Sequence, residues 1–286
     1  MSDCLNWPHE REPIDTVGLG VFDGIHRGHR AIADQCSHLM TFCPYPRAVL
    51  HPEAPMIPRL TLLSEMRQLF PNTLALQFTR AIAELSAAEF FERIVVQELA
   101  PKRIVVGEDF QFGAKRSGHG AILQALGASA GIDVVLVPLV MQAGEPVKSG
   151  RIRTAIQSGQ FNHAVDLLGH PYSLSGSVVS GDGRGRTLGF PTANLALPET
   201  KLGLLPGVYA GYLADTQAPV VVYSGSAPTF DTNTHRHEVH ILDYDGNLYG
   251  QSLSVMVTQQ IRGEMQFAST DALQAQIQRD IQAARP

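Results

Sequence analysis

The segment 20–29, GVFDGIHRGH, combines glycines with two histidines three residues apart. Glycines let a backbone approach a phosphate, and the start of a helix favours negative charge. His26 and His29 can donate hydrogen bonds to a phosphate as charge builds in a transition state. The H-x-G-H pattern alone also fits a glycine-rich turn with two exposed histidines or, less well, a zinc site, since no cysteine or third histidine is suitably placed. The preceding FDG triplet favours the phosphate site.

A second glycine-rich segment, 181–194, has the sequence GDGRGRTLGFPTAN. It is neither a Walker A loop nor a dinucleotide fingerprint, because it lacks G-K-[ST] and does not sit between a strand and a helix. Its glycines and arginines suit backbone and guanidinium contacts with phosphate. Thr192 and Asn194 offer the hard oxygen ligands that Mg²⁺ prefers. The alternative is a flexible hairpin with a turn at 191–194.

Glu238 lies in a strand-like segment in which Glu238, His240 and Leu242 share one face. A carboxylate at the mouth of a barrel can accept the proton of an attacking hydroxyl. A lone glutamate on a strand is otherwise an ordinary surface residue.

Two further segments are compatible with ligand binding. Residues 107–113, GEDFQFG, offer aromatic side chains that can pack on a planar ring, although both phenylalanines fit a protein core equally. Residues 147–153, VKSGRIR, form a cationic helix start that can clamp a triphosphate, or else a solvated basic turn.

Alternating strand and helix patterns position the first of these segments. Strands are expected at 16–22, 39–42, 73–78, 103–107 and 133–137, and helices at 30–37, 86–99 and 121–129. Ser86 and Glu89 form a capping box at the start of the second helix. The alternation predicts a parallel α/β sheet covered by helices. Ligands bind such sheets at the carboxyl ends of the strands, where 20–29 and 107–113 would meet.

The second half has a different pattern. Short helices are expected at 151–157 and 161–168, with Gly159 ending the first. Strands are then expected at 172–180, 208–214, 220–223, 238–243 and 248–257, with a hairpin turn at Asp245-Gly246. An amphipathic helix at 270–284 carries Leu273, Ile277 and Ile281 on one stripe. This half therefore predicts a small antiparallel β-barrel with a terminal helix. The two domains are expected to span 1–160 and 161–286.

The composition narrows the class of protein. The 286 residues are 44% hydrophobic and 17% charged, which is enough for two packed domains, and the net charge of −5 argues against a nucleic-acid partner. Three cysteines without a C-x-x-C pair predict neither a disulfide framework nor a zinc ribbon, as in a reducing cytoplasm. Neither a signal peptide nor a membrane helix is expected, so no membrane partner is predicted. Self-association stays open.

These five segments occur in the same order in the prokaryotic bifunctional riboflavin kinase/FMN adenylyltransferase (FAD synthetase) family, which this chain resembles over about residues 14–284. Further matching motifs are PRLT at 58–61, LSAAEF at 85–90, GVYA at 207–210 and PTF at 228–230. The C-terminal match, GRTLGFPTANL at 185–195, is highly specific. H-x-G-H alone would be shared with the wider nucleotidylyltransferase superfamily, whose Rossmann-like sheet the N-terminal domain is expected to have.

The resemblance implies a flavin-nucleotide enzyme with two sites. In the barrel, Glu238 would act as base toward the 5′-hydroxyl of riboflavin, with Thr192 and Asn194 holding Mg²⁺, to give FMN. In the α/β domain, His26 and His29 would assist attack of FMN on a second ATP, to give FAD and pyrophosphate. The implied phosphate contacts are Gly20, Phe22, Asp23, Gly24, Gly28, Ser149, Arg151 and Arg153 in the α/β site, and Gly181, Arg184, Gly185, Arg186 and Gly189 in the barrel. Asp109, Phe110 and Phe112 are candidate flavin contacts.

The chain departs from the family pattern at four places. The usual ISSTRIR is VKSGRIR at 147–153, and the usual T-F-x-P-H-P is TFCPYP at 41–46. The usual N-I-G-x-R-P-T-F is YSGSAPTF at 223–230, and the usual His-Gly is Ser180-Gly181. These departures predict lower efficiency at both sites, and more so at the adenylyltransferase site. A kinase with a scaffold N-terminal domain and a non-catalytic flavin sensor are the competing hypotheses.

Overall fold

The protein is described from a computed structural model that covers residues 14–181, 183–226 and 235–285. The chain divides into two compact units, 1–149 and 150–286. The segment expected to lack a signal peptide, 1–12, lies outside the described residues. The expected boundary at 160/161 falls between the helices α7 (Ser149–Gln157) and α8 (Phe161–Leu168).

The first unit is built on a five-stranded sheet in the order β3-β2-β1-β4-β7. The strands are β1 (Thr16–Leu19), β2 (His38–Cys43), β3 (Thr73–Gln77), β4 (Arg103–Gly107) and β7 (Asp133–Val137). All four pairings are parallel, which confirms the predicted parallel α/β sheet. The predicted bounds of β4 and β7 are also confirmed.

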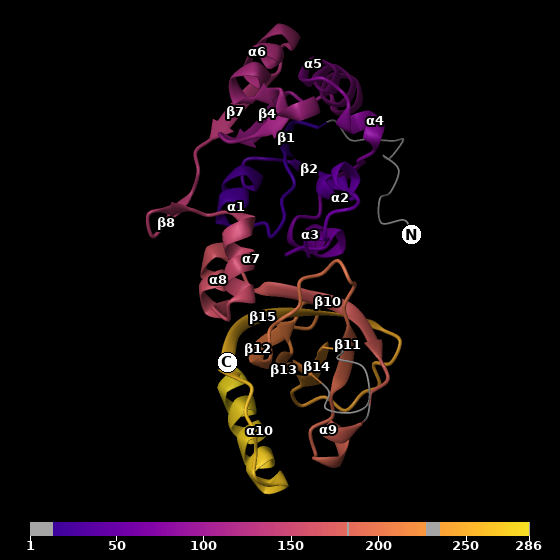
Figure 1. The fold of residues 1–286 in the computed structure, drawn as a ribbon, viewed down its shortest axis with the longest axis vertical. Helices are drawn as coiled ribbons and strands as arrows, with labels where there is room; N and C mark the ends of the chain where they lie inside the picture. Colours follow the sequence, from indigo (N-terminus) through magenta and orange to yellow (C-terminus); the bar gives the residue numbers. More distant parts are fainter. Residues whose placement is uncertain (1–13, 182, 227–234, 286) are drawn as a thin grey trace. The chain divides into compact units, whose positions relative to one another are not determined.

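Helices cover both faces of this sheet (Figure 1). One face packs on α5 (Ala87–Phe90), the π-helix η1 (Phe91–Leu99) and α6 (Gly120–Ala130), and the other on α1 (Arg27–Ala33) and α3 (Leu63–Leu69). In β4, Ile104 and Val106 join the first core and Val105 joins the second. This alternation is the period of two that a strand imposes.

Several local predictions are confirmed and others are wrong. The capping box forms, since Ser86 Oγ accepts from Glu89 N at 3.2 Å and Glu89 Oε2 accepts from Ser86 N at 2.9 Å. The first strand ends at Leu19 and not at Phe22, because Phe22 adopts φ +52°. The first helix begins at Arg27 and ends before Ser37. Cys36 is a free thiol, and Cys4 lies outside the described residues.

Short elements that the sequence did not predict complete the unit. They are α2 (Pro46–Leu50), α4 (Arg80–Ala83), the 3₁₀ turn η2 (Ala114–Arg116), and the small hairpins β5 (Gln111–Phe112) with β6 (Gly118–His119) and β8 (Met141–Gln142) with β9 (Glu145–Pro146). Such short segments carry too few residues for a periodic pattern.

The second unit is a closed antiparallel barrel in the order β10-β11-β14-β13-β12-β15. Its strands are β10 (Tyr172–Val179), β11 (Ala193–Ala196), β12 (Gly207–Leu213), β13 (Pro219–Ser226), β14 (His235–Ile241) and β15 (Ser252–Gly263). The short helix α9 (Arg184–Thr187) precedes β11. The predicted barrel with a terminal helix is confirmed, and Gly159 follows α7 with φ 78° as expected.

The predicted hairpin at Asp245-Gly246 is wrong. β14 pairs with β11 and β13, whereas β15 pairs with β10 and β12, so the connection joins strands that are not neighbours. A two-residue hairpin needs positive φ at its turn, but the left-handed residues of this connection are Asp243 and Gly250. β15 consequently begins at Ser252 and not at 248.

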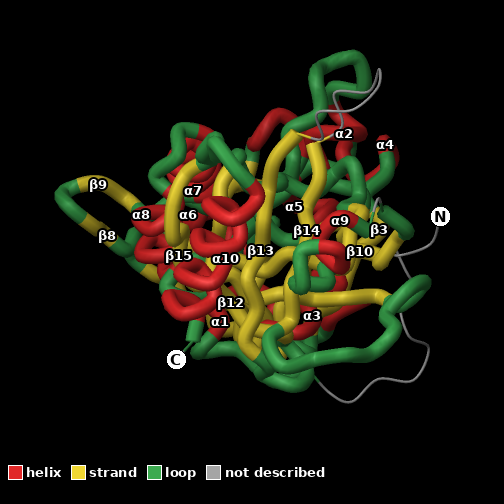
Figure 2. The backbone as a smooth tube through the Cα atoms, turned by 90° about the horizontal axis from the view of Figure 1, so that it is seen from below, coloured by secondary structure: helices red, strands yellow, loops and turns green. Residues whose placement is uncertain are grey.

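Helices close the barrel at two places. In α8, Phe161 is buried and its ring makes edge contacts with Tyr172 and Tyr209 of the barrel. The terminal helix α10 (Thr270–Ala284) has the predicted bounds and is capped by the preceding Ser269, whose Oγ accepts from Ala272 N. It lies along β12, β13 and β15 (Figure 2).

Candidate active sites

The barrel encloses a cavity of about 320 Å³ with a polar and an apolar part. Strands and the glycine-rich loop supply the polar part, and α10 and the segment before it supply most of the apolar part. The lining residues include Gly183, Gly185, Thr192, Asn194, Arg236, Glu238 and His240, with Val208, Val221, Tyr223, Arg262, Met265, Phe267, Leu273, Ile277, Asp280 and Ile281. The stripe of α10 predicted from the sequence therefore forms a wall of this cavity.

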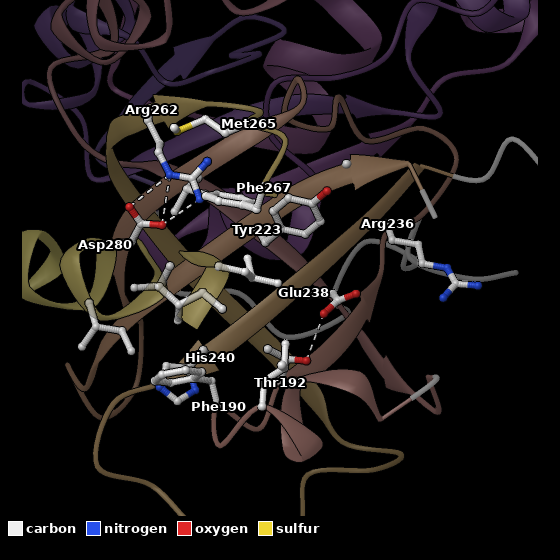
Figure 3. A pocket seen from close by; sticks show the side chains of 18 of the residues that line it. Phe190, Thr192, Tyr223, Arg236, Glu238, His240, Arg262, Met265, Phe267 and Asp280 are labelled. Atoms are coloured by element: carbon white, nitrogen blue, oxygen red, sulfur yellow. Dashed lines mark hydrogen bonds and ion pairs between the residues drawn. The ribbon is translucent and has the colours of Figure 1, made fainter. Parts of the chain in front are cut away.

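Glu238, Thr192 and Asn194 come together at the polar part. Asn194 of β11 stands directly opposite Glu238 of β14 in the antiparallel register. Thr192 Oγ1 donates to Glu238 Oε2 at 3.0 Å (Figure 3). The predicted base and the two predicted metal ligands thus share one site. In place of the predicted loop, Asn194 belongs to a strand, because β11 pairs on both sides with β10 and β14.

The glycine-rich loop approaches these residues closely. A Cβ at Gly181 would collide with the Asn194 amide, and one at Gly185 would collide with the Phe190 carbonyl and lie 2.9 Å from Thr192 Oγ1. Gly189 adopts φ 86°, which favours glycine. The loop therefore needs glycine to bring its backbone to the site, as a phosphate-binding loop does. Arg184 and Arg186 both lie in α9, and the Arg186 side chain is exposed.

Arg262 and Asp280 also line the cavity, although no sequence pattern led us to expect them there. The Arg262 guanidinium donates to both carboxylate oxygens of Asp280, at 2.8 to 3.1 Å, and Gln276 Nε2 donates to Asp280 Oδ1 at 2.8 Å. The Asp280 side chain is 3% exposed. This pair fastens α10 to β15. An aspartate one residue from Ile281, on the apolar stripe of α10, was the signal that could have revealed it.

In the first unit, His26 and His29 stack at the start of α1. Their ring centroids are 3.6 Å apart, and Phe22 contacts His29 edge-on. His26 Nδ1 accepts from His29 N at 3.3 Å and so caps the helix. Within the part of the chain that the structure describes, His29 Nδ1 is enclosed and has no hydrogen-bond partner. Burial, followed by the neighbouring His26, lowers the pKa of His29 well below its usual value, so the imidazole is neutral.

These histidines line a cavity of about 220 Å³ at the carboxyl ends of the strands. The other lining residues are Gly28, Ile32, Gly107, Asp109, Val137, Pro138, Leu139, Val140, Val147, Lys148 and Ser149. The predicted meeting of segments 20–29 and 107–113 is therefore confirmed. Lys148 Nζ donates to Asp109 Oδ2 at 2.9 Å, and both side chains are about half exposed.

Asp23 and Ser149 are engaged in contacts within the protein. The buried Asp23 carboxylate accepts from the backbone N–H groups of Leu60 and Thr61, at 2.9 and 3.2 Å, and lies 3.6 Å from Arg59 Nε. Ser149 Oγ donates to the Asp23 carbonyl at 2.7 Å. Asp23 thus ties the PRLT motif to the histidine segment, so a positioning role fits its carboxylate better than the predicted phosphate contact.

The other predicted residues of this site are placed as follows. Gly20 is next to the Phe22 ring, Phe22 and Gly24 are buried, and Gly24 has φ 98°. Phe112 is 7% exposed and packs in the core, with Phe110 stacked on it, which is the core alternative left open by the sequence.

Arg151 and Arg153 lie in α7 within the second unit. Segment 227–234, with the departure at Ala227, lies outside the described residues.

Comparisons with known proteins match each of the two units to a family model. A family model described as FAD synthetase matches residues 9–151, and one described as riboflavin kinase matches 168–286. The bifunctional riboflavin kinase/FMN adenylyltransferase of Escherichia coli K12 is 37% identical, over 93% of this chain and 90% of that protein. The enzyme of the same name from Pseudomonas fluorescens is 37% identical, over 97% and 94%. A crystal structure of a macrolide-efflux protein from Streptococcus pneumoniae has a TM-score of 0.83 at 30% identity, covering 96% and 95%.

Paired histidines over a parallel sheet and a carboxylate beside a glycine-rich loop in a barrel lie in the two domains that match the FAD synthetase and riboflavin kinase models, and these models define a transferase. The chain belongs to the bifunctional riboflavin kinase/FMN adenylyltransferase family. Within residues 14–181, 183–226 and 235–285, no helix has the length and apolar character needed to cross a membrane.

Proposed function

We propose that this chain phosphorylates riboflavin to FMN in the barrel and adenylylates FMN to FAD in the α/β unit, with ATP as donor in both steps. The observation that carries the proposal is the arrangement of the barrel cavity. Glu238, Thr192 and Asn194 stand at its polar part, and an apolar part large enough for a flat ring adjoins them. A substrate with an aromatic ring and a hydroxylated chain matches both parts.

Glu238 acts as the general base of the kinase step. Its Oε2 accepts from Thr192, which orients the carboxylate and leaves Oε1 for the substrate. The 5′-hydroxyl of riboflavin transfers its proton to Glu238 while its oxygen attacks the γ-phosphorus of ATP. The bond between that phosphorus and the bridging oxygen breaks, and ADP leaves. Positioning and charge stabilisation supply most of the rate in phosphoryl transfer.

Thr192 and Asn194 would hold Mg²⁺ with the nucleotide. Both side chains offer neutral oxygen atoms, and glycine at 181 and 185 lets the loop backbone pass close to them, because a Cβ at either position would collide with this part of the site. Mg²⁺ in such sites takes few protein ligands together with phosphate oxygens and water, so the two residues fit it. When bound, the ion would neutralise charge on the phosphates.

The paired histidines serve the adenylyl step. A phosphate oxygen of FMN attacks the α-phosphorus of ATP, and pyrophosphate leaves. Burial keeps His29 neutral, and among the described residues its enclosed Nδ1 has no hydrogen-bond partner. A bound triphosphate would favour the charged imidazole, because an adjacent anion raises the pKa of a histidine. The stacked pair would then donate to the charge that develops on the phosphates.

A kinase with a weakened or inactive adenylyl site is the second candidate function. Lys148 replaces a short hydroxyl residue of the family pattern. Its ammonium group donates to Asp109, so it is already engaged within the protein. Gly150 has no side chain to donate. The proposed partners are riboflavin, FMN and ATP with Mg²⁺, and the proposed location is the cytoplasm, where ATP is made available.

One time course tests the proposal. Purified protein is incubated with riboflavin, ATP and Mg²⁺, and riboflavin, FMN and FAD are separated at intervals. We expect FMN to appear first and FAD to follow. Accumulation of FMN without FAD would select the kinase-only function, and unchanged riboflavin would refute the proposal.

A further inference from the structure

We propose that Tyr223 determines the ring specificity of the kinase site, by forming an aromatic wall against which the flat ring of the substrate stacks. This inference deepens the proposed kinase function and rests on it. The family pattern implies an asparagine here, so the wall would be a property of this chain.

Tyr223 stands directly beside the catalytic base. In the antiparallel register it is opposite Glu238 of β14 on one side and Val208 of β12 on the other. All three residues line the cavity. Because directly opposed side chains lie about 5 Å apart at Cβ, a ring packed on Tyr223 is within one short chain of the Glu238 carboxylate. That spacing suits a substrate whose reacting hydroxyl is carried on a chain attached to its ring.

The Tyr223 ring is held in place at its far end. Its Oη donates to Glu264 Oε1 at 3.0 Å, in the segment that follows β15. Burial, and next this hydrogen bond, raise the pKa of Tyr223 to about 12. The phenol is therefore a neutral donor at physiological pH and does not compete with Glu238 as a base. Gly225 leaves room for the ring, because a Cβ there would collide with the phenol.

The surroundings of Tyr223 suit a flat, polarisable ring. Phe267 and Met265 line the cavity beside Tyr223, as Figure 3 shows, and Leu273 and Ile277 of α10 line it as well. An aromatic ring gains stacking energy in offset contact with tyrosine, beyond the area that it buries. An asparagine would remove most of this surface and the contact with Glu264. Tyr223 consequently favours a substrate with an extended aromatic ring over a simple polyol.

The test compares Tyr223→Asn with Tyr223→Phe in the full-length protein. Riboflavin binding is followed by the quenching of its fluorescence, and steady-state kinase assays give KM for riboflavin and for ATP. We expect Tyr223→Asn to weaken riboflavin binding roughly ten-fold or more and to reduce the quenching, with a far smaller change in KM for ATP. Tyr223→Phe keeps the ring and should retain the quenching, with only a small loss of affinity.

The control is Tyr249→Asn, which changes an exposed tyrosine outside the cavity and should leave both measurements unchanged. Thermal unfolding of each variant shows whether it folds. If Tyr223→Asn does not fold, the quenching by Tyr223→Phe tests the inference. Wild-type affinity and quenching in a folded Tyr223→Asn, or loss of quenching in a folded Tyr223→Phe, would overturn the inference. Absence of kinase turnover in the wild-type protein would instead refute the proposed function.

Discussion

The ion pair between Arg262 and Asp280 gives a prediction whose size follows from the structure. Asp280→Asn keeps the shape of the side chain and removes its charge. The Asp280 and Arg262 side chains are 3% and 16% exposed, so the arginine would be left largely buried without a counter-charge. Breaking a buried pair costs about 3–5 kcal/mol. Because Arg262 retains some contact with water, we expect a loss of about 3 kcal/mol, at the lower end of that range.

The expected loss is measurable by calorimetry on the full chain. In a unit of this size, a loss of about 3 kcal/mol lowers Tm by roughly 10 °C. The affected transition is that of the barrel unit, which is recognised because riboflavin binding shifts it. The variant should also raise KM for riboflavin, because Leu273, Ile277 and Ile281 of α10 line the cavity. Its rate of FAD formation from supplied FMN should not change.

A matched control is available at the end of the same helix. Arg285, directly after α10, pairs with Asp243 at 3.0 Å, but these side chains are 50% and 73% exposed. Asp243→Asn removes an equivalent pair in water, where ion pairs contribute little, so we expect no measurable shift in Tm or KM. Equal effects of the two substitutions, or no effect of Asp280→Asn, would refute the argument from burial.

Three further predictions concern other parts of the molecule. Because burial lowers the pKa of His29, the unfolded chain takes up this proton below pH about 6.5 while the folded chain resists it. The free energy of unfolding should therefore fall by about 1 kcal/mol between pH 7.5 and 5.5, and chemical denaturation of His29→Gln should show less of this loss. A fragment of residues 160–286 should fold and phosphorylate riboflavin. The shorter fragment 172–286 should be less stable, because it lacks Phe161. An insoluble 160–286 fragment would contradict this prediction. The double substitution Lys148→Ser with Gly150→Thr restores the family hydroxyls and should raise the rate of FAD formation alone. The loss of a donor to the transition state costs about 10²–10³ in rate. A wild-type protein that converts FMN to FAD faster than it phosphorylates riboflavin would contradict a weakened site.

The sequence predicted the parts of the fold that rest on periodic patterns. Strands β4 and β7 and the terminal helix α10 have their predicted bounds because their apolar spacing is regular. The hairpin at Asp245-Gly246 was wrong because turn residues indicate a bend and do not determine which strands pair. Strand β11 was missed because a short segment beside glycines and proline has no visible period.

The site was predictable where a residue type itself carries the chemistry. The structure brings together Glu238, Thr192 and Asn194, and separately His26 and His29. It also placed the Asp23 carboxylate against the PRLT motif, and Phe112 in the core, because burial depends on distant segments. Asp280 beside the apolar stripe of α10 was a signal for a buried acid, but its partner Arg262 lies 18 positions away on a strand, and no local pattern identifies that partner.

The measurement that tests the account most directly compares Glu238→Ala with His26→Asn, each supplied with riboflavin and, separately, with FMN. Asparagine can still cap α1, since it is among the residues preferred at that position, but it lacks the imidazole. Glu238→Ala should lose most FMN formation, by about 10²–10⁴-fold, and still convert FMN to FAD, whereas His26→Asn should make FMN and stop there. If either variant loses both steps while folded, or Glu238→Ala phosphorylates riboflavin at the wild-type rate, two separate sites with these residues are contradicted.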